Sequence, residues 1–168
     1  MKIIFLDFDG VISVADTHYS LSGKKMELVK RICDETGAKI IISSSWRHID
    51  VPNTLRSIEE SKAHRKNDPF ILADYVIDIT PRFYFKYGDE SVYIPRGVEI
   101  QHTIYKYMYR YKDLGVDKIT NYLILDDDSD MLLWHKDHFI KTDPYEGIVE
   151  SDVEKAIEIL NNEKLYIV

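Results

Sequence analysis

A short apolar run that ends in two carboxylates constrains the fold of this chain most. Residues 3–12 read Ile-Ile-Phe-Leu-Asp-Phe-Asp-Gly-Val-Ile. Four consecutive apolar residues suit a strand that is buried on both faces, as in a parallel sheet covered by helices. Because residues two apart in an extended segment point the same way, Asp7 and Asp9 are expected to project together just past the strand, where open α/β sheets place ligands. Gly10 then allows a sharp turn.

Two neighbouring carboxylates disfavour each other's ionised form, so Asp7 and Asp9 need a proton or a cation nearby. Mg²⁺ takes oxygen ligands and is commonly held by one or two carboxylates together with a substrate phosphate. Asp and Gly are also ordinary turn residues. Taken alone, this stretch leaves two alternatives open, a magnesium site and a strand that simply ends in a turn.

The remaining periodicity predicts strands that alternate with helices. Strands are expected at residues 39–43, 75–79, 122–125 and 139–141, and helices at residues 22–37, 53–64, 98–112 and around 153–160. A strand, helix and strand in succession form a parallel unit with a right-handed connection. The chain of 168 residues is most simply one domain with a single core. Residues 48–95 are expected to form a small insertion or lid within that domain.

Composition limits the environment and the partners. Cys33 is the only cysteine, which excludes an intramolecular disulfide and favours a reducing, cytoplasmic location. The apolar opening is too short for a signal peptide, and no stretch approaches the length of a membrane span. No feature identifies a protein partner.

The charge is unevenly distributed. The net charge of −7 argues against broad nonspecific binding of nucleic acid, but residues 47–112 hold 11 basic and 9 acidic groups, and residues 113–168 hold 5 and 14. The basic middle segment is also rich in aromatic residues. Such a mixture could stack on bases while contacting phosphate, or the aromatic residues could belong to the core and the basic ones to the solvated surface.

Polar residues follow the second predicted strand, where residues 43–47 read Ser-Ser-Ser-Trp-Arg. A parallel neighbour would bring them to the same edge as Asp7. Phosphate oxygens could accept hydrogen bonds from the hydroxyls of Ser44 and Ser45 and from the Arg47 guanidinium. The alternative is a serine-rich turn with Trp46 in the core.

Arg96 begins a predicted helix, where a cation is unfavourable unless it binds an anion. Arg96 is therefore either a phosphate contact or a surface arginine.

Between these segments, residues 82–94 alternate aromatic and polar side chains around Tyr-Gly-Asp. This pattern predicts a hairpin or lid over the site, and insertions of this kind commonly select substrate.

The next predicted strand, residues 122–125, runs directly into Asp126-Asp127-Asp128-Ser129-Asp130. Four carboxylates so close repel one another. An acidic helix N-terminus would explain Asp128 and Asp130, but not the pairing with Asp7 and Asp9. We therefore interpret the cluster as part of an oxygen-rich magnesium site.

Together, these motifs resemble the haloacid dehalogenase (HAD) superfamily in order and spacing. The closer likeness is to the small HAD-type domain found alone in phages and bacteria and in multidomain RNA-repair proteins. It rests on Ser-Ser-Trp-Arg (44–47), Arg-Gly-x-Glu-Ile (96–100), Leu-Asp-Asp-Asp-Ser-Asp-Met (125–131) and Lys-Thr-Asp (141–143) with Gly147. The resemblance implies a doubly wound, Rossmann-like parallel sheet in a three-layer α/β/α arrangement with no large cap domain, and Mg²⁺-dependent phosphoryl transfer.

The resemblance also implies a role for each site residue. Asp7 would attack phosphorus and become an aspartyl phosphate, and Asp9 would protonate the leaving oxygen and then activate water. Ser44 or Ser45 would hold a phosphate oxygen, and Arg96 would take the family's basic position. The implied magnesium ligands are Asp7, Asp9, Asp126 and Asp127. Asp130 would support these ligands without binding the ion itself.

Two points stay open in the sequence. Arg96 lies 30 residues before Asp126, so Lys106 and Lys118 are alternatives for the basic position. Arg47 is similar to the arginine of the Ser-x-Arg turn in polynucleotide 3′-phosphatase domains, which favours a phosphorylated nucleotide or nucleic-acid end as substrate. The alternatives are a phosphatase for small metabolites and a binding protein that keeps the fold without turnover.

Overall fold

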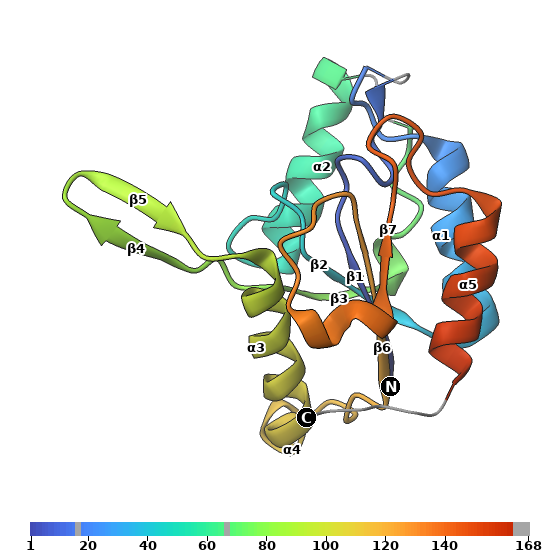
Figure 1. The fold of residues 1–168 in the computed structure, drawn as a ribbon. Helices are drawn as coiled ribbons and strands as arrows, with labels where there is room; N and C mark the ends of the chain where they lie inside the picture. The colour runs from blue at the N-terminus through green and yellow to red at the C-terminus, as the bar shows by residue number, and fades with distance from the viewer. Residues whose placement is uncertain (16–17, 66–67, 163–168) are drawn as a thin grey trace.

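A five-stranded parallel sheet forms the centre of the computed structural model, which describes residues 1–15, 18–65 and 68–162. Its strands lie in the order β3-β2-β1-β6-β7 (Figure 1). They are β1 (Lys2–Leu6), β2 (Lys39–Ile42), β3 (Val76–Ile79), β6 (Asn121–Asp126) and β7 (Phe139–Lys141). The sheet confirms the predicted parallel α/β class.

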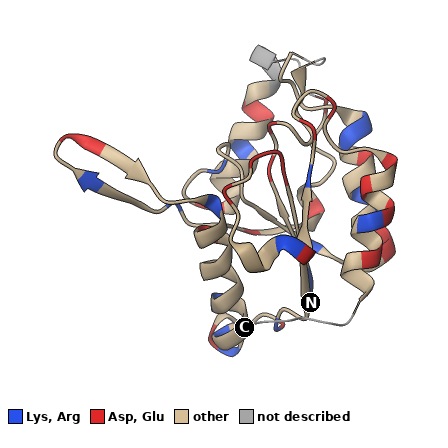
Figure 2. Ribbon diagram, viewed as in Figure 1, with Lys and Arg blue, Asp and Glu red and all other residues tan. Residues whose placement is uncertain are grey.

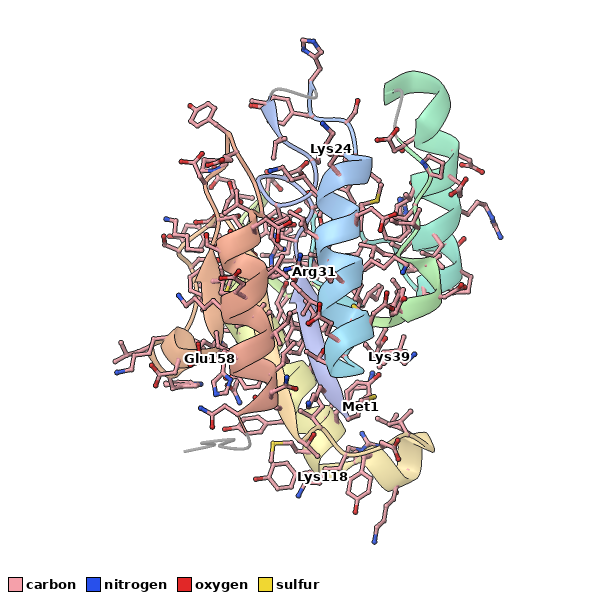
Figure 3. All side chains as sticks on the ribbon, turned by 90° about the vertical axis from the view of Figure 1, so that its right-hand side faces the viewer. Met1, Lys24, Arg31, Lys39, Lys118 and Glu158 are labelled. Carbon is pink, nitrogen blue, oxygen red and sulfur yellow. The ribbon has the colours of Figure 1, made fainter. Side chains whose placement is uncertain are left out.

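Helices cover both faces of this sheet and make three layers. They are α1 (Gly23–Thr36), α2 (Val51–Arg65), α3 (Arg96–Tyr109), α4 (Tyr111–Leu114) and α5 (Glu150–Asn161), with the 3₁₀ helices η2 (Ala73–Tyr75) and η3 (Leu133–His138). Helices α1 and α5 lie side by side on one face (Figure 3) and α3 lies on the other. No helix in the described ranges is long and apolar enough to cross a membrane.

Strand β1 shows why the sheet needs both helical layers. Ile4 and Leu6 pack into the cluster that includes the apolar faces of α1 and α5, whereas Ile3 and Phe5 pack into the cluster that includes α3. All four side chains have no exposed surface. A continuous apolar run is therefore the pattern that a strand buried on both faces requires.

The order of the strands creates a switch point between β1 and β6. From β1 the chain proceeds outward through β2 to β3, and then crosses to β6 and β7 on the other side of β1. The loops after β1 and β6 consequently leave the sheet in opposite directions, and the crevice between them is where open α/β sheets bind ligands. Leu6 pairs with Leu125 in this register, which places the residues after both strands at the same edge.

The predicted hairpin is present as β4 (Tyr84–Tyr87) and β5 (Glu90–Tyr93), an antiparallel pair separate from the main sheet. All eight of its strand residues are exposed. It projects away from the sheet (Figure 1), so in this structure it does not lie over the carboxyl edge as a lid. The helix α2 within the predicted insertion instead packs on the core through Ile58.

A buried ion pair ties the loop after β2 to α3. The Arg47 guanidinium donates to the Glu99 carboxylate, and both side chains are about 5% exposed or less. The other Glu99 oxygen accepts from the backbone N–H of Phe83 at 2.7 Å, at the base of the hairpin. One carboxylate thus joins α3, the loop after β2 and the hairpin.

We expect Glu99→Gln to lower the free energy of unfolding by about 3 kcal/mol, because it leaves the buried Arg47 charge without a counter-charge. Asp113→Asn is the matched control, since Asp113 pairs with Arg110 at 3.6 Å on the surface and its loss should cost less than about 0.5 kcal/mol. Urea unfolding measures both. Equal effects of the two substitutions would show that the buried pair does not anchor these segments.

Candidate active site

Three carboxylates converge at the switch point. Oxygen atoms of Asp7, Asp126 and Asp127 all lie within 4.8 Å of one another. Asp7 directly follows β1 and its backbone N–H donates to the carbonyl of Leu125 at 3.0 Å, so the last ladder bonds of the sheet bring the two loops together. Figure 2 shows acidic residues in the loops at this end of the sheet. The predicted meeting of the first and second aspartate motifs is therefore present.

The cluster is electrostatically unfavourable as three bare anions. Burial raises the pKa of Asp126 to about 7, and the charge of Asp7 adds to this effect. Burial also raises the pKa of Asp7, against the opposing effects of Arg96 and of a hydrogen bond from Ser44. The pKa of Asp127 is raised as well, chiefly by burial. Such groups need protons or a cation to be stable together.

The donor set fits a hard divalent cation. The buried Oδ2 atom of Asp126 accepts no hydrogen bond from any described residue, and a buried carboxylate oxygen without a partner is costly. Three carboxylates with no sulfur or imidazole suit Mg²⁺ rather than a softer metal. Asp7, Asp126 and Asp127 are thus the residues that could hold it.

Gly10 permits the close approach of the two loops. Its φ of 69° is in the left-handed region, and a Cβ atom at this position would overlap the Asp127 carboxyl group. The Thr142 hydroxyl donates to the Gly10 carbonyl at 2.7 Å and holds the turn from the loop after β7. Any larger residue at Gly10 would therefore displace a carboxylate of the cluster.

Arg96 reaches the cluster from the start of α3. Its Nη1 atom lies 3.5 Å from Asp7 Oδ1 and 3.9 Å from Asp126 Oδ2. Nη1 is buried and has no hydrogen-bond partner among the described residues, so it remains available to an anion. This geometry supports the prediction that Arg96 contacts phosphate.

Asp130 holds the start of α3 in this position. Its Oδ2 atom accepts from the backbone N–H of Arg96 at 2.6 Å, and its carbonyl accepts from Gly97 N–H at 3.3 Å. A Cβ atom on Gly97 would come within 2.6 Å of the Leu132 backbone, so glycine is required for this approach. Asp130 lies outside the three-carboxylate cluster and orients Arg96.

The two alternative basic residues lie elsewhere. Lys106 forms an ion pair with Asp78 at 2.9 Å. Lys118 lies near Met1 (Figure 3), whose terminal amine donates to the Lys118 carbonyl at 2.8 Å, at the amino ends of the strands. Of the three candidates for the basic position, only Arg96 contacts the carboxylates of the cluster, those of Asp7 and Asp126.

The Asp9 side chain does not join the cluster of Asp7, Asp126 and Asp127, although Asp9 was predicted with them as a magnesium ligand. Its carboxylate accepts from the Trp46 indole N–H at 3.0 and 3.1 Å and from the Ser45 hydroxyl at 3.4 Å. The reason is that β1 ends at Leu6, so the alternation of a strand does not extend to Asp9. Asp9 instead faces the loop after β2, while Ser44 bonds to Asp7.

Arg47 also differs from its predicted role. Its five N–H groups are used by five acceptors, which are Thr80 O, Ser43 O, Ser44 O, Pro81 O and Glu99 Oε2. A buried guanidinium must satisfy its donors within the protein, and this one has none left for a phosphate. Arg47 therefore shapes the serine loop rather than contacting substrate.

Sequence reasoning missed three residues around the site. Trp46 binds Asp9 through its indole, Glu99 holds Arg47, and the Arg82 guanidinium donates to the carbonyls of Ser45 and Arg47. Of the three, only Glu99 could have been found from the sequence, because it is an acidic residue next to the apolar stripe of α3. The other two depend on how distant loops meet.

A cavity of about 990 Å³ adjoins Asp9 on the side of β2 and β3. Its lining includes Ser45, Trp46, His48, Arg82, His102 and Lys106. The cavity is large compared with an inorganic phosphate, and of the site aspartates it is Asp9 that lines it. It provides space for the rest of a phosphorylated molecule next to Asp9.

A doubly wound parallel sheet, with aspartates after β1 and β6 meeting at its switch point, defines the HAD-like class. A family model described as the HAD domain in Swiss Army Knife RNA repair proteins matches residues 3–153. The chain belongs to this family, and the resemblance predicted from the motifs is confirmed. Comparisons with curated proteins and with solved structures gave no match.

The pKa of Asp126 leads to a pH-dependent prediction. A carboxyl whose pKa is about 7 in the folded protein and ordinary in the unfolded chain stabilises the fold below its ordinary pKa, and this stability is lost as pH rises through about 7. In EDTA, the thermal midpoint should therefore be lower at about pH 8 than at about pH 5.5. Mg²⁺ binds the ionised carboxylates, so it should raise the midpoint by several degrees at about pH 8 and little at about pH 5.5.

Differential scanning fluorimetry measures the thermal midpoint under these conditions. Asp126→Asn is the control, and it should reduce both the pH dependence of the midpoint in EDTA and its increase with Mg²⁺. A magnesium effect that is equal at the two pH values would contradict the assignment of Asp126 as a ligand.

Proposed function

We propose that this protein is a Mg²⁺-dependent phosphohydrolase that removes phosphate from a nucleotide or polynucleotide end. The observation that carries the proposal is the meeting of Asp7, Asp126 and Asp127 with the Nη1 atom of Arg96, which forms ion pairs with Asp7 and Asp126 but no hydrogen bond with a described residue. Membership in a family of HAD domains from RNA repair proteins supports both the reaction and the nucleic-acid substrate.

Asp7, Asp126 and Asp127 would hold the cation, which supplies positive charge to the carboxylates and to the phosphoryl group. Arg96 Nη1, between Asp7 and Asp126, donates to a phosphoryl oxygen, and its charge favours the ionised form of Asp7 against the effect of burial. The Ser44 hydroxyl, which bonds to Asp7, offers a second donor when it turns from Asp7 to a phosphoryl oxygen. Fixed donors of this kind stabilise charge that develops in the transition state.

Asp7 acts as the nucleophile. Its carboxylate oxygen forms a bond to phosphorus while the bond from phosphorus to the substrate's ester oxygen breaks, which gives an aspartyl phosphate. Water then attacks this phosphorus, the bond to the Asp7 oxygen breaks, and inorganic phosphate leaves. The Asp7 carboxylate is regenerated.

Asp9 carries the proton in both steps. It protonates the leaving ester oxygen in the first step and takes a proton from the attacking water in the second. The Trp46 indole N–H contacts both Asp9 oxygens and thereby fixes the carboxylate beside Asp7. Separation of the Asp9 carboxylate from the cation ligands suits this role, because a group bound to a cation would not hold a proton.

The open edge of the sheet favours a large substrate over a small metabolite. The hairpin that was expected to cover the site projects away from it (Figure 1), and the cavity that Asp9 lines also includes Arg82 in its lining. The presence of both Asp7 and Asp9 favours an enzyme over a binding protein that lacks turnover.

Phosphate release from 3′- and 5′-phosphorylated oligonucleotides, mononucleotides and sugar phosphates tests this function. We expect the wild type to act on the nucleic-acid ends with Mg²⁺, and Asp7→Asn to lower kcat by at least about a thousandfold, because the nucleophile is lost. Asp128→Asn, at an exposed aspartate in the same loop as Asp126, is the matched control and should stay within about threefold of the wild type.

Each other outcome decides against part of the proposal. Release from sugar phosphates alone would replace the substrate class with small metabolites. Activity that survives in Asp7→Asn would remove Asp7 as the nucleophile, and no release from any substrate would favour a binding protein.

A further inference from the structure

The hairpin β4-β5 exposes several large apolar side chains to solvent. Five of its residues are large and exposed, namely Tyr84, Phe85, Tyr87, Val92 and Tyr93. A two-stranded hairpin with no layer packed on it is marginally stable in water. A contiguous exposed patch of large apolar side chains is typical of an interaction site.

The two faces of the hairpin differ in composition. Tyr84 pairs with Tyr93, and Lys86 pairs with Ser91, so alternation places these four side chains on one face. The two tyrosine rings lie 6.2 Å apart. Two other pairs, Phe85 with Val92 and Tyr87 with Glu90, lie on the opposite face.

The first face combines aromatic rings with a cation and a hydroxyl and carries no aliphatic side chain. This chemistry suits bases and phosphates, because every base has a face that can stack and every phosphate a charge. A dry interface with another protein would instead be expected to contain aliphatic residues.

The hairpin also begins next to the cavity that Asp9 lines. Arg82, which lines the cavity, precedes β4 by two residues and donates to the carbonyls of Ser45 and Arg47. The Phe83 ring contacts His102, another lining residue, at 5.1 Å between centroids. The Phe83 N–H bonds to buried Glu99, which fixes the base of the hairpin to the core.

We propose that the hairpin face of Tyr84, Lys86, Ser91 and Tyr93 binds the single-stranded polynucleotide whose phosphate end enters the cavity beside Asp9. The inference rests on the proposed function for the identity of the strand. Bases stack on the two tyrosines, and Lys86 contacts a phosphate between them. The strand then passes Arg82 into the cavity.

Fluorescence anisotropy of a labelled single-stranded oligonucleotide with hydroxyl ends tests this inference without requiring turnover. We expect Tyr84→Ala/Tyr93→Ala to raise the Kd about tenfold or more, since each lost stacking partner weakens binding substantially. Tyr84→Phe/Tyr93→Phe keeps the rings and should retain wild-type affinity, which separates stacking from folding.

Tyr105→Ala/Tyr109→Ala is the matched control, because these tyrosines form a second exposed ring pair at 5.9 Å on α3. Its Kd should stay near that of the wild type. Equal losses in the two alanine pairs would overturn the inference.

Self-association that depends on the hairpin, with no strand binding, would assign the face to a second copy of the chain and would also overturn the inference. The phosphate-release panel decides the proposed function separately: hairpin-dependent binding without any phosphate release would contradict that function while leaving the strand-binding face in place.

Discussion

Repulsion among the carboxylates of Asp7, Asp126 and Asp127 is the constraint around which the site is organised. Parallel pairing of β1 with β6 forces the first two together at the edge of the sheet, and the turn at Gly10 brings in the third. Burial then makes each harder to ionise. Arg96 offsets only part of this cost, so a cation held by the three carboxylates would stabilise the site.

The loops around this cluster are built to hold it. Asp130 fixes the start of α3 so that Arg96 reaches Asp7, and Arg47 joins the loop after β2 to Glu99. These residues resemble ligands in the sequence, because they are charged and lie close to the motifs. In the structure Asp130 positions Arg96, and Arg47 positions the serine loop.

The sequence was sufficient for the layers of the fold and for the meeting of Asp7 with Asp126. Both follow from local pattern, because a continuous apolar run such as residues 3–6 needs two covered faces, and parallel neighbours deliver their carboxyl ends to one edge. Asp9 was misplaced because it lies beyond the end of β1, where a turn replaces alternation. Trp46 and Arg82 depend on contacts between loops distant in sequence, which no local pattern encodes. The basic residue of the site stayed open for the same reason.

The most direct test of a cation site at the switch point is anomalous diffraction from crystals soaked with Mn²⁺, which accepts the same oxygen ligands as Mg²⁺. We expect one strong peak between the carboxylates of Asp7, Asp126 and Asp127, at about 2–2.5 Å from an oxygen of each. A peak at another place, or none at saturating Mn²⁺ with Arg96 closing onto the carboxylates, would contradict the account.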